Sequence, residues 1–180
     1  MKATAEHPCS FYSDDRVLAS TVAKFLAPAF ASRQAVIAIG TPEHLTAIED
    51  RLRSSGHDID GARVSGQYSS MDAQWALQQL TVHGMPTSER FNAVLGPHIK
   101  RAADEYGSVR AFGEIVSLLW RDGKRQAALR LEELWNDALG YHPLALVCGY
   151  NVRSFNDAAD ADGVIGIISS HTNVIVPKVA

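Results

Sequence analysis

The chain has 180 residues, of which 46% are hydrophobic and 21% are charged, and its formal net charge is -3. These values fit one globular domain over residues 1–180. The mild negative charge disfavours a general nucleic-acid-binding protein, because such proteins use basic surface to neutralise phosphates. No apolar run approaches the ~18 residues that span a bilayer, and the first residues lack the apolar stretch of a signal peptide. We therefore expect a cytoplasmic protein that contacts no membrane.

Short apolar runs alternate with segments of helical period, which is the pattern of an α/β protein. The runs at 35–39 and 144–148 are apolar throughout, which is typical of strands buried on both faces of a parallel sheet. Five strands are predicted, at Pro8–Tyr12, Ala35–Ile39, Arg63–Tyr68, Val109–Gly113 and Leu144–Cys148.

Helices are predicted between these strands. The first begins with an N-cap at Ser13 followed by two acids, and Pro28 should bend or end it. The second has Thr41 as its cap and Gly56 at its left-handed end. The remaining helices are expected at Ser70–Val82, Ser88–Tyr106 with a kink at Gly96-Pro97, Glu114–Trp120, Lys124–Leu139 and Asp157–Ser170, and the tail from Val174 is expected to be extended.

The predicted fold class is α/β. Strands that alternate with helices favour a single three-layer domain with a mainly parallel sheet, five-stranded or larger, and with helices on both faces.

The common phosphate-binding and catalytic motifs are missing. The nearest approach to a phosphate loop is Gly61–Gly66, after which Gln67 and Tyr68 replace the required Lys and Ser or Thr. The turn after the first strand, Ser13–Asp15, carries carboxylates that would repel phosphate. The chain also lacks the glycine fingerprint of dinucleotide-binding domains and the nucleophile elbow of serine hydrolases. We therefore expect no enzyme and no catalytic residue, although a degenerate ATPase stays open.

Cysteine and histidine usage predicts neither a disulfide framework nor a metal site. Cys9 and Cys148 are far apart in sequence and each lies beside apolar residues, as expected for buried thiols of a reduced compartment. The seven histidines lack metal-ligand spacing with one another or with the cysteines. We expect them to be scattered surface or capping residues, and we predict no metal and no cofactor.

Glu114 is the first candidate ligand-binding residue. It stands at the carboxyl end of a predicted inner strand, and ligands of open α/β sheets bind in the crevice beyond those ends. The alternative is that Glu114 only interacts favourably with the N-terminus of its own helix. The weaker candidates His7, Tyr12, Tyr68 and Tyr150 stand at or near strand ends, where they would project into the same crevice or simply pack.

A second group of candidates lies on the helix predicted at 124–139. Glu132, Trp135 and Asn136 share one face, and their carboxylate, indole and amide would suit the wall of a ligand pocket. The alternative is structural: an aromatic ring beside a partly buried acid that satisfies a backbone amide. The opposite stripe is expected to face the core and consists of Ala127, Leu131, Leu134 and Ala138.

Several short segments occur in an order that resembles a known family. They are His7–Tyr12, Phe25-Leu26, Gly66–Tyr68 with Asp72, Phe112–Val116 with Leu119-Trp120, Leu131–Asn136 and Val147–Tyr150. Together they resemble the MEDS domain, the sensory domain named for methanogens, methylotrophs and the dichloromethane-responsive regulator DcmR. The resemblance runs from about His7 to His171, which puts the core of the domain at about residues 7–171.

The resemblance implies a RecA-like α/β core, related to the circadian-clock ATPases but without an intact phosphate loop. In a RecA-like strand order the first and last predicted strands are neighbours, so Cys9 and Cys148 would approach each other. The resemblance also implies a sensory module, proposed to bind small hydrocarbon derivatives and often joined to a histidine kinase or a DNA-binding domain. Neither of those domains is evident in this sequence, so we expect any output to pass through a partner or through self-association.

We therefore hypothesise a sensory and regulatory domain that binds a small apolar organic molecule at the carboxyl ends of the strands. Glu114, Tyr12 and Trp135 would orient the molecule. Binding would shift the population of conformations at a surface of the domain, and a signalling partner, such as a histidine kinase or a transcription regulator, would respond to that shift. The alternatives are a RecA-like interaction or oligomerisation module with no small ligand, and a degenerate nucleotide-binding ATPase.

Overall fold

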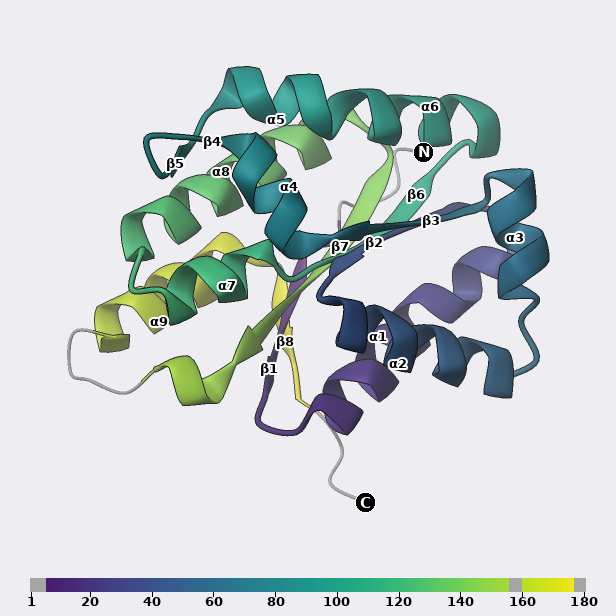
Figure 1. The fold of residues 1–180 in the computed structure, drawn as a ribbon, viewed down its shortest axis with the longest axis horizontal. Coiled ribbons are helices and arrows are strands. Elements are labelled where there is room, and N and C mark those ends of the chain that lie inside the picture. Colours follow the sequence, from purple (N-terminus) through teal and green to yellow (C-terminus); the bar gives the residue numbers. More distant parts are fainter. Residues whose placement is uncertain (1–5, 156–159, 177–180) are drawn as a thin grey trace.

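The computed structural model of the protein describes residues 6–155 and 160–176. Its centre is a six-stranded parallel sheet in the order β3-β2-β6-β7-β1-β8 (Figure 1). The strands of this sheet are β1 (Pro8–Tyr12), β2 (Ala35–Gly40), β3 (Tyr68–Asp72), β6 (Val109–Gly113), β7 (Leu144–Asn151) and β8 (Asn173–Ile175). A separate antiparallel pair consists of β4 (Thr81–Val82) and β5 (Met85–Pro86).

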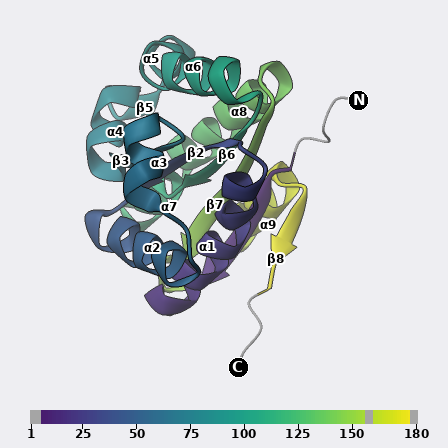
Figure 2. The same cartoon turned by 90° about the vertical axis from the view of Figure 1, so that its right-hand side faces the viewer.

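Helices cover both faces of the sheet, so the predicted three-layer α/β fold is confirmed (Figures 1 and 2). One face packs against α1 (Asp15–Ala31), α2 (Pro42–Ser54) and α3 (Ile59–Ser65). The other face packs against α4 (Ala73–Leu80), α5 (Ser88–Val94), α6 (Gly96–Tyr106), α7 (Ile115–Arg121), α8 (Arg125–Tyr141) and α9 (Asp160–Ser170). A 3-10 turn at Val152–Ser154 follows β7.

The central strands are apolar because both of their faces are covered. All six residues of β2 are buried, as expected for a strand between two layers of helices. Side chains alternate between the layers along a strand, so Cys9 of β1 belongs to the core on the α8 side whereas Tyr12 belongs to the core on the α1 side. The sheet therefore separates two apolar cores.

Local capping explains where α1 and α2 begin and end. Asp14, one residue later than predicted, caps α1 by accepting a hydrogen bond from the backbone N–H of Arg16. Thr41 caps α2 as predicted, and Gly56 follows that helix with a φ of +88°. Pro28 does not end α1, which continues to Ala31.

The strand predicted at Arg63–Tyr68 is wrong. The first half of that segment, Arg63–Ser65, belongs to α3, which Asp58 caps by accepting a hydrogen bond from the backbone N–H of Gly61. The strand β3 instead begins at Tyr68 and lies at the edge of the sheet, where its serines are exposed. An edge strand has little need of an apolar pattern, and this is why the sequence signal for β3 is weak.

Other boundaries differ in smaller ways. The helix predicted at 70–82 is limited to α4, and the one predicted at 88–106 is divided into α5 and α6, near the expected kink. The helix α8 continues through Gly140 to Tyr141, two residues beyond the predicted end at Leu139. Residues 157–159 of the last predicted helix lie outside the described residues, and α9 is described from Asp160. The start of the tail that was predicted to be extended from Val174 belongs to β8, which pairs with β1, and residues 177–180 lie outside the described residues.

The strands β1 and β7 are neighbours, as the RecA-like order implies. Cys9 is the Cα partner of Cys148 across this pair, and both thiols are free and buried.

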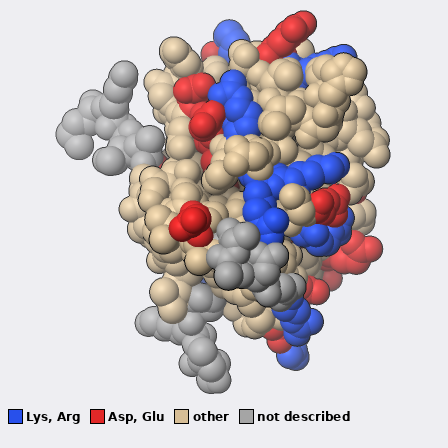
Figure 3. Space-filling view, turned by 90° about the vertical axis from the view of Figure 1, so that its left-hand side faces the viewer, with Lys and Arg blue, Asp and Glu red and all other residues tan. Residues whose placement is uncertain are grey.

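None of the described helices has the length and apolar character needed to cross a membrane. On the face shown in Figure 3, Lys and Arg side chains form a band that is interrupted by Asp and Glu.

Candidate functional site

Glu114 lies at the carboxyl end of β6, where its side chain is bonded entirely within the protein. The carboxylate accepts hydrogen bonds from the Tyr12 hydroxyl (3.2 Å) and from the backbone N–H of Thr41 (3.0 Å), and the Nδ1 atom of His44 is 2.6 Å from its Oε1 atom. The Nε2 atom of His44 lies 3.2 Å from Asp15. These contacts form a polar chain along this edge of the sheet.

The surroundings of Glu114 are compact and polar. Only 2% of the residue is exposed, and although it occupies the N-cap position of α7 its side chain makes no capping hydrogen bond. The hydrogen bond to Glu114 raises the pKa of His44, and burial next to the same carboxylate raises the pKa of Tyr12. Ligand contact by Glu114 and Tyr12 stays a prediction, and a ligand there would have to displace some of these bonds.

A second polar cluster lies between β1, β7 and α8, on the opposite face of the sheet from Tyr12. His7, Glu132 and Cys148 are buried, and the side chain of His171 is also enclosed. The Nε2 atom of His7 is 3.4 Å from both the Cys148 sulfur and the Glu132 Oε2 atom. The Nε2 atom of His171 is 3.4 Å from that same Oε2 atom, and the Cys148 sulfur is 3.8 Å from it.

Strand pairing brings these distant residues together. His7 precedes β1, and its backbone exchanges hydrogen bonds with Thr172, which follows His171. Cys148 lies on β7, the other neighbour of β1. Glu132 reaches the same place from α8, which packs over β7.

Three further groups hold the side chains of this cluster in place. The Tyr150 hydroxyl donates a short hydrogen bond to the Oε1 atom of Glu132. The Asn136 amide lies 2.9 Å from the Nδ1 atom of His7 through its oxygen, and its nitrogen donates to the backbone carbonyl of Ser170. The Nδ1 atom of His171 lies 2.6 Å from the backbone carbonyl of Ile167.

Burial disfavours the charged form of each group in the cluster. It lowers the pKa of His7 to about 4 and also lowers the pKa of His171, so both imidazoles are neutral near pH 7. It raises the pKa of Glu132 to about 7 and raises the pKa of the Cys148 thiol well above its usual range.

The expectation that all the histidines are scattered surface or capping residues is wrong for His7 and His171. One ligand atom from each of His7, Glu132, Cys148 and His171 lies within 4.8 Å of the other three, an arrangement that could hold a metal ion. Sequence spacing missed this group because its members come from four segments rather than from one motif.

The predicted site residues therefore fall into separate places. Glu114 and Tyr12 meet at the carboxyl end of the sheet, whereas His7 and Glu132 meet in the buried cluster, where Asn136 and Tyr150 contact them. Tyr68 stands at the start of β3, and its hydroxyl donates to Glu49 at 3.0 Å. Trp135 is buried edge-on against Phe91.

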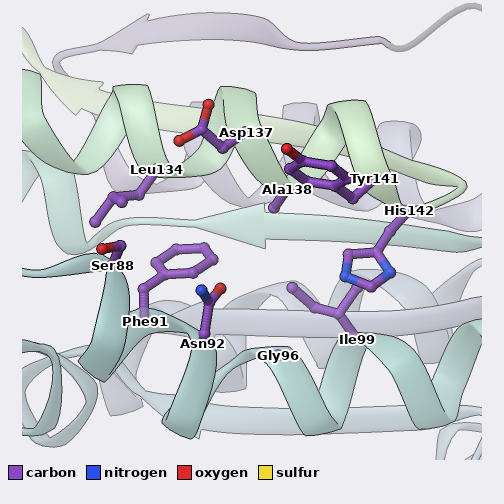
Figure 4. A pocket seen from close by; sticks show the side chains of 10 residues that line it. All are labelled: Ser88, Phe91, Asn92, Gly96, Ile99, Leu134, Asp137, Ala138, Tyr141 and His142. Carbon is purple, nitrogen blue, oxygen red and sulfur yellow. The ribbon is translucent and has the colours of Figure 1, made fainter.

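A hollow of about 130 Å³ lies between α8 and the pair α5–α6 (Figure 4). Four of its lining residues are buried and apolar: Phe91, Ile99, Leu134 and Ala138. Its other lining residues bring polar groups and one small residue to the rim: Ser88, Asn92, Gly96, Asp137, Tyr141 and His142. A wider and more open hollow of about 430 Å³ lies between the end of α1 and α3.

The helix α8 contributes to both the hollow and the buried cluster. Leu134 and Ala138, predicted to face the core, line the hollow, whereas Glu132 belongs to the cluster and Asn136 contacts His7 of the cluster. Trp135 lies between these positions in the sequence and packs on Phe91, another lining residue of the hollow. A shift of α8 would therefore move groups at both places.

Comparison with known proteins identifies the family. Residues 6–172 match the family model described as MEDS, the methanogen/methylotroph, DcmR sensory domain. No curated protein matches the chain in a sequence search. Because the matched region covers most of the 180 residues, the chain belongs to the MEDS family of sensory domains.

Proposed function

We propose that this sensory domain detects a small, largely apolar organic molecule that binds in the hollow between α8 and α5–α6. The size of the hollow, about 130 Å³, supports this proposal, since a cavity of about 150 Å³ lined by apolar side chains can bind benzene. The apolar floor would bury the molecule, and the polar rim would discriminate between functional groups.

The hollow suits this role better than the carboxyl end of the sheet. The oxygens of Glu114 already bond to Tyr12, His44 and the backbone of Thr41, so a ligand there competes with interactions that are already made. A ligand in the hollow competes only with water and gains apolar contact with Phe91 and Leu134.

The proposed signal is a change in the position of α8 that a partner protein reads. The helix α8 also packs against α7 and α9. A ligand that moves α8 from the side of the hollow would therefore also move these two helices. The partner would be a histidine kinase or a transcription regulator, as the family suggests. In this proposal the ligand is not turned over.

Binding in the hollow is tested with benzene, dichloromethane and 1-butanol as probes. Nuclear magnetic resonance titration of the full chain should show shifts that saturate and that centre on α5, α6 and α8. The variant Ala138→Leu fills the hollow and should abolish these shifts. The matched variant Tyr12→Phe, at the other end of the sheet, should leave them unchanged.

The opposite outcomes separate the alternatives. Shifts that Tyr12→Phe removes and Ala138→Leu preserves would place the ligand at the strand ends. If no probe binds and light scattering shows a stable oligomer, the interaction module without a ligand is favoured. Calorimetric titration with ATP and Mg²⁺ tests the degenerate ATPase; saturable binding would contradict our proposal.

A further inference from the structure

The buried cluster of His7, Glu132, Cys148 and His171 contains a ring nitrogen of His171 that has no hydrogen-bond partner among the described residues. The Nδ1 atom of His171 faces a backbone carbonyl, which can only accept, so this nitrogen carries the ring proton. The Nε2 atom of the neutral ring then presents a lone pair to the cluster. It is buried, and it finds no hydrogen-bond partner of acceptable geometry among the described residues.

His7 has the same orientation for a similar reason. The Asn136 amide nitrogen donates to the carbonyl of Ser170, which leaves the Asn136 oxygen to accept from the Nδ1 atom of His7. The Nε2 atom of His7 therefore also presents a lone pair. Two imidazole lone pairs, one carboxylate oxygen and one sulfur thus converge on one enclosed point.

Four of the six separations between these atoms match a tetrahedral metal site, and all six are within 4.8 Å. With bonds of about 2.0–2.3 Å, ligand atoms around a tetrahedral zinc ion are about 3.3–3.8 Å apart. The Nε2 atom of His7 is 3.4 Å from the Cys148 sulfur and 3.4 Å from the Glu132 Oε2 atom. That Oε2 atom is also 3.4 Å from the Nε2 atom of His171 and 3.8 Å from the Cys148 sulfur.

The groups around the four ligands are those that metal sites use to orient them. A carbonyl and an amide oxygen hold the outer nitrogens of the two imidazoles, and the Tyr150 hydroxyl holds the second carboxylate oxygen. A divalent cation would also balance the charges of one carboxylate and one thiolate, which is the condition for burying them.

We propose that His7, Glu132, Cys148 and His171 bind one zinc ion in a closed, structural site. The ion connects four parts of the chain: His7 before β1, Cys148 of β7, Glu132 of α8, and His171 between α9 and β8. Because the protein fills all four positions, the site has no place for a substrate. This inference does not depend on the proposed ligand of the hollow, and either can fail without the other.

Metal analysis and cobalt spectroscopy test the site. The full chain, purified without chelators, should carry about one zinc ion as measured by plasma mass spectrometry. The metal-free protein titrated with Co²⁺ should show the intense visible bands of tetrahedral cobalt and a thiolate-to-cobalt charge-transfer band. Zinc should raise the Tm of the metal-free protein.

The two cysteines provide a matched pair of variants. Cys148→Ser should lose the charge-transfer band, whereas Cys9→Ser, which alters the neighbouring buried thiol, should keep it. His171→Ala should reduce zinc retention without altering the circular dichroism of the fold. If one of these variants fails to fold, the cobalt spectrum of the wild-type protein still shows whether a tetrahedral thiolate site is present. A wild-type protein that binds no zinc, or that gives the weak bands of octahedral cobalt, overturns the proposal.

Discussion

The interaction between His44 and Glu114 makes the stability of the protein depend on pH. Glu114, Asp15 and the ring of Tyr12 face His44, and the hydrogen bond to Glu114 raises the pKa of this imidazole in the folded state. Because the pKa of His44 is higher in the folded state, its protonation stabilises the fold, and this contribution is complete at pH values below the pKa of an unfolded histidine, about 6.5. This contribution is lost as the pH rises through the folded pKa.

We therefore predict that His44→Gln removes a pH-dependent part of the free energy of unfolding. The variant should be less stable by about 1–3 kcal/mol at pH 6, because Glu114 loses a charged partner. The difference from the wild type should shrink towards pH 9. Urea unfolding between about pH 6 and pH 9 measures this. The exposed His98→Gln serves as the control. A constant difference between His44→Gln and the wild type would contradict the prediction.

Single residues also show what the sequence could and could not predict about the site. The position of Glu114 directly after an apolar strand is a local feature that the sequence reveals, whereas no local feature identifies its partner His44, since 70 residues separate the two. Glu132 was noticed as a polar residue on a helix face. Its contact with His7, Cys148 and His171 depends on the order of β7, β1 and β8, which no local pattern reveals.

At the level of elements, burial decided which strands the sequence could predict. The strands β2 and β7 were recognised because both of their faces are covered, so their residues are almost all apolar. The edge strand β3 was misplaced because its sequence, YSSMD, has only one buried residue. The sequence predicts an extended segment at β8, but its pairing with β1 depends on the order of the strands in the sheet.

The helix α9 depends on a glycine for its close packing. A Cβ atom built at Gly163 would lie 2.2 Å from the Trp120 ring, whereas one at Gly140 of α8 would meet nothing within 4 Å. Gly163→Ala should therefore destabilise the protein by about 1–3 kcal/mol through overpacking.

The matched change Gly140→Ala should instead stabilise the protein by about 0.5–1 kcal/mol, because alanine favours the helix. Urea unfolding of both variants measures the difference. Equal effects of the two substitutions would show that α9 does not pack on Trp120 in solution.

In the whole molecule, the C-terminal segment completes structures that begin near the N-terminus. The strand β8 covers the outer edge of β1, α9 contributes Ile167 to the core, and His171 joins His7 in the buried cluster. The first and last described parts of the chain therefore stabilise each other, and the cluster connects them to α8.

A chain that ends at residue 155 should accordingly lose more than the proposed metal site. It exposes the edge of β1 and the core surface beneath α9, and unpaired strand edges promote association. We expect it to be less stable by at least about 3 kcal/mol and to aggregate. The full-length His171→Ala variant should retain less zinc yet keep its association state, because β8 remains paired with β1. Light scattering and urea unfolding of the two proteins separate these effects. A truncated chain as soluble and stable as the full protein would mean that α9 and β8 contribute little to the fold, and that the cluster cannot depend on them for its closure.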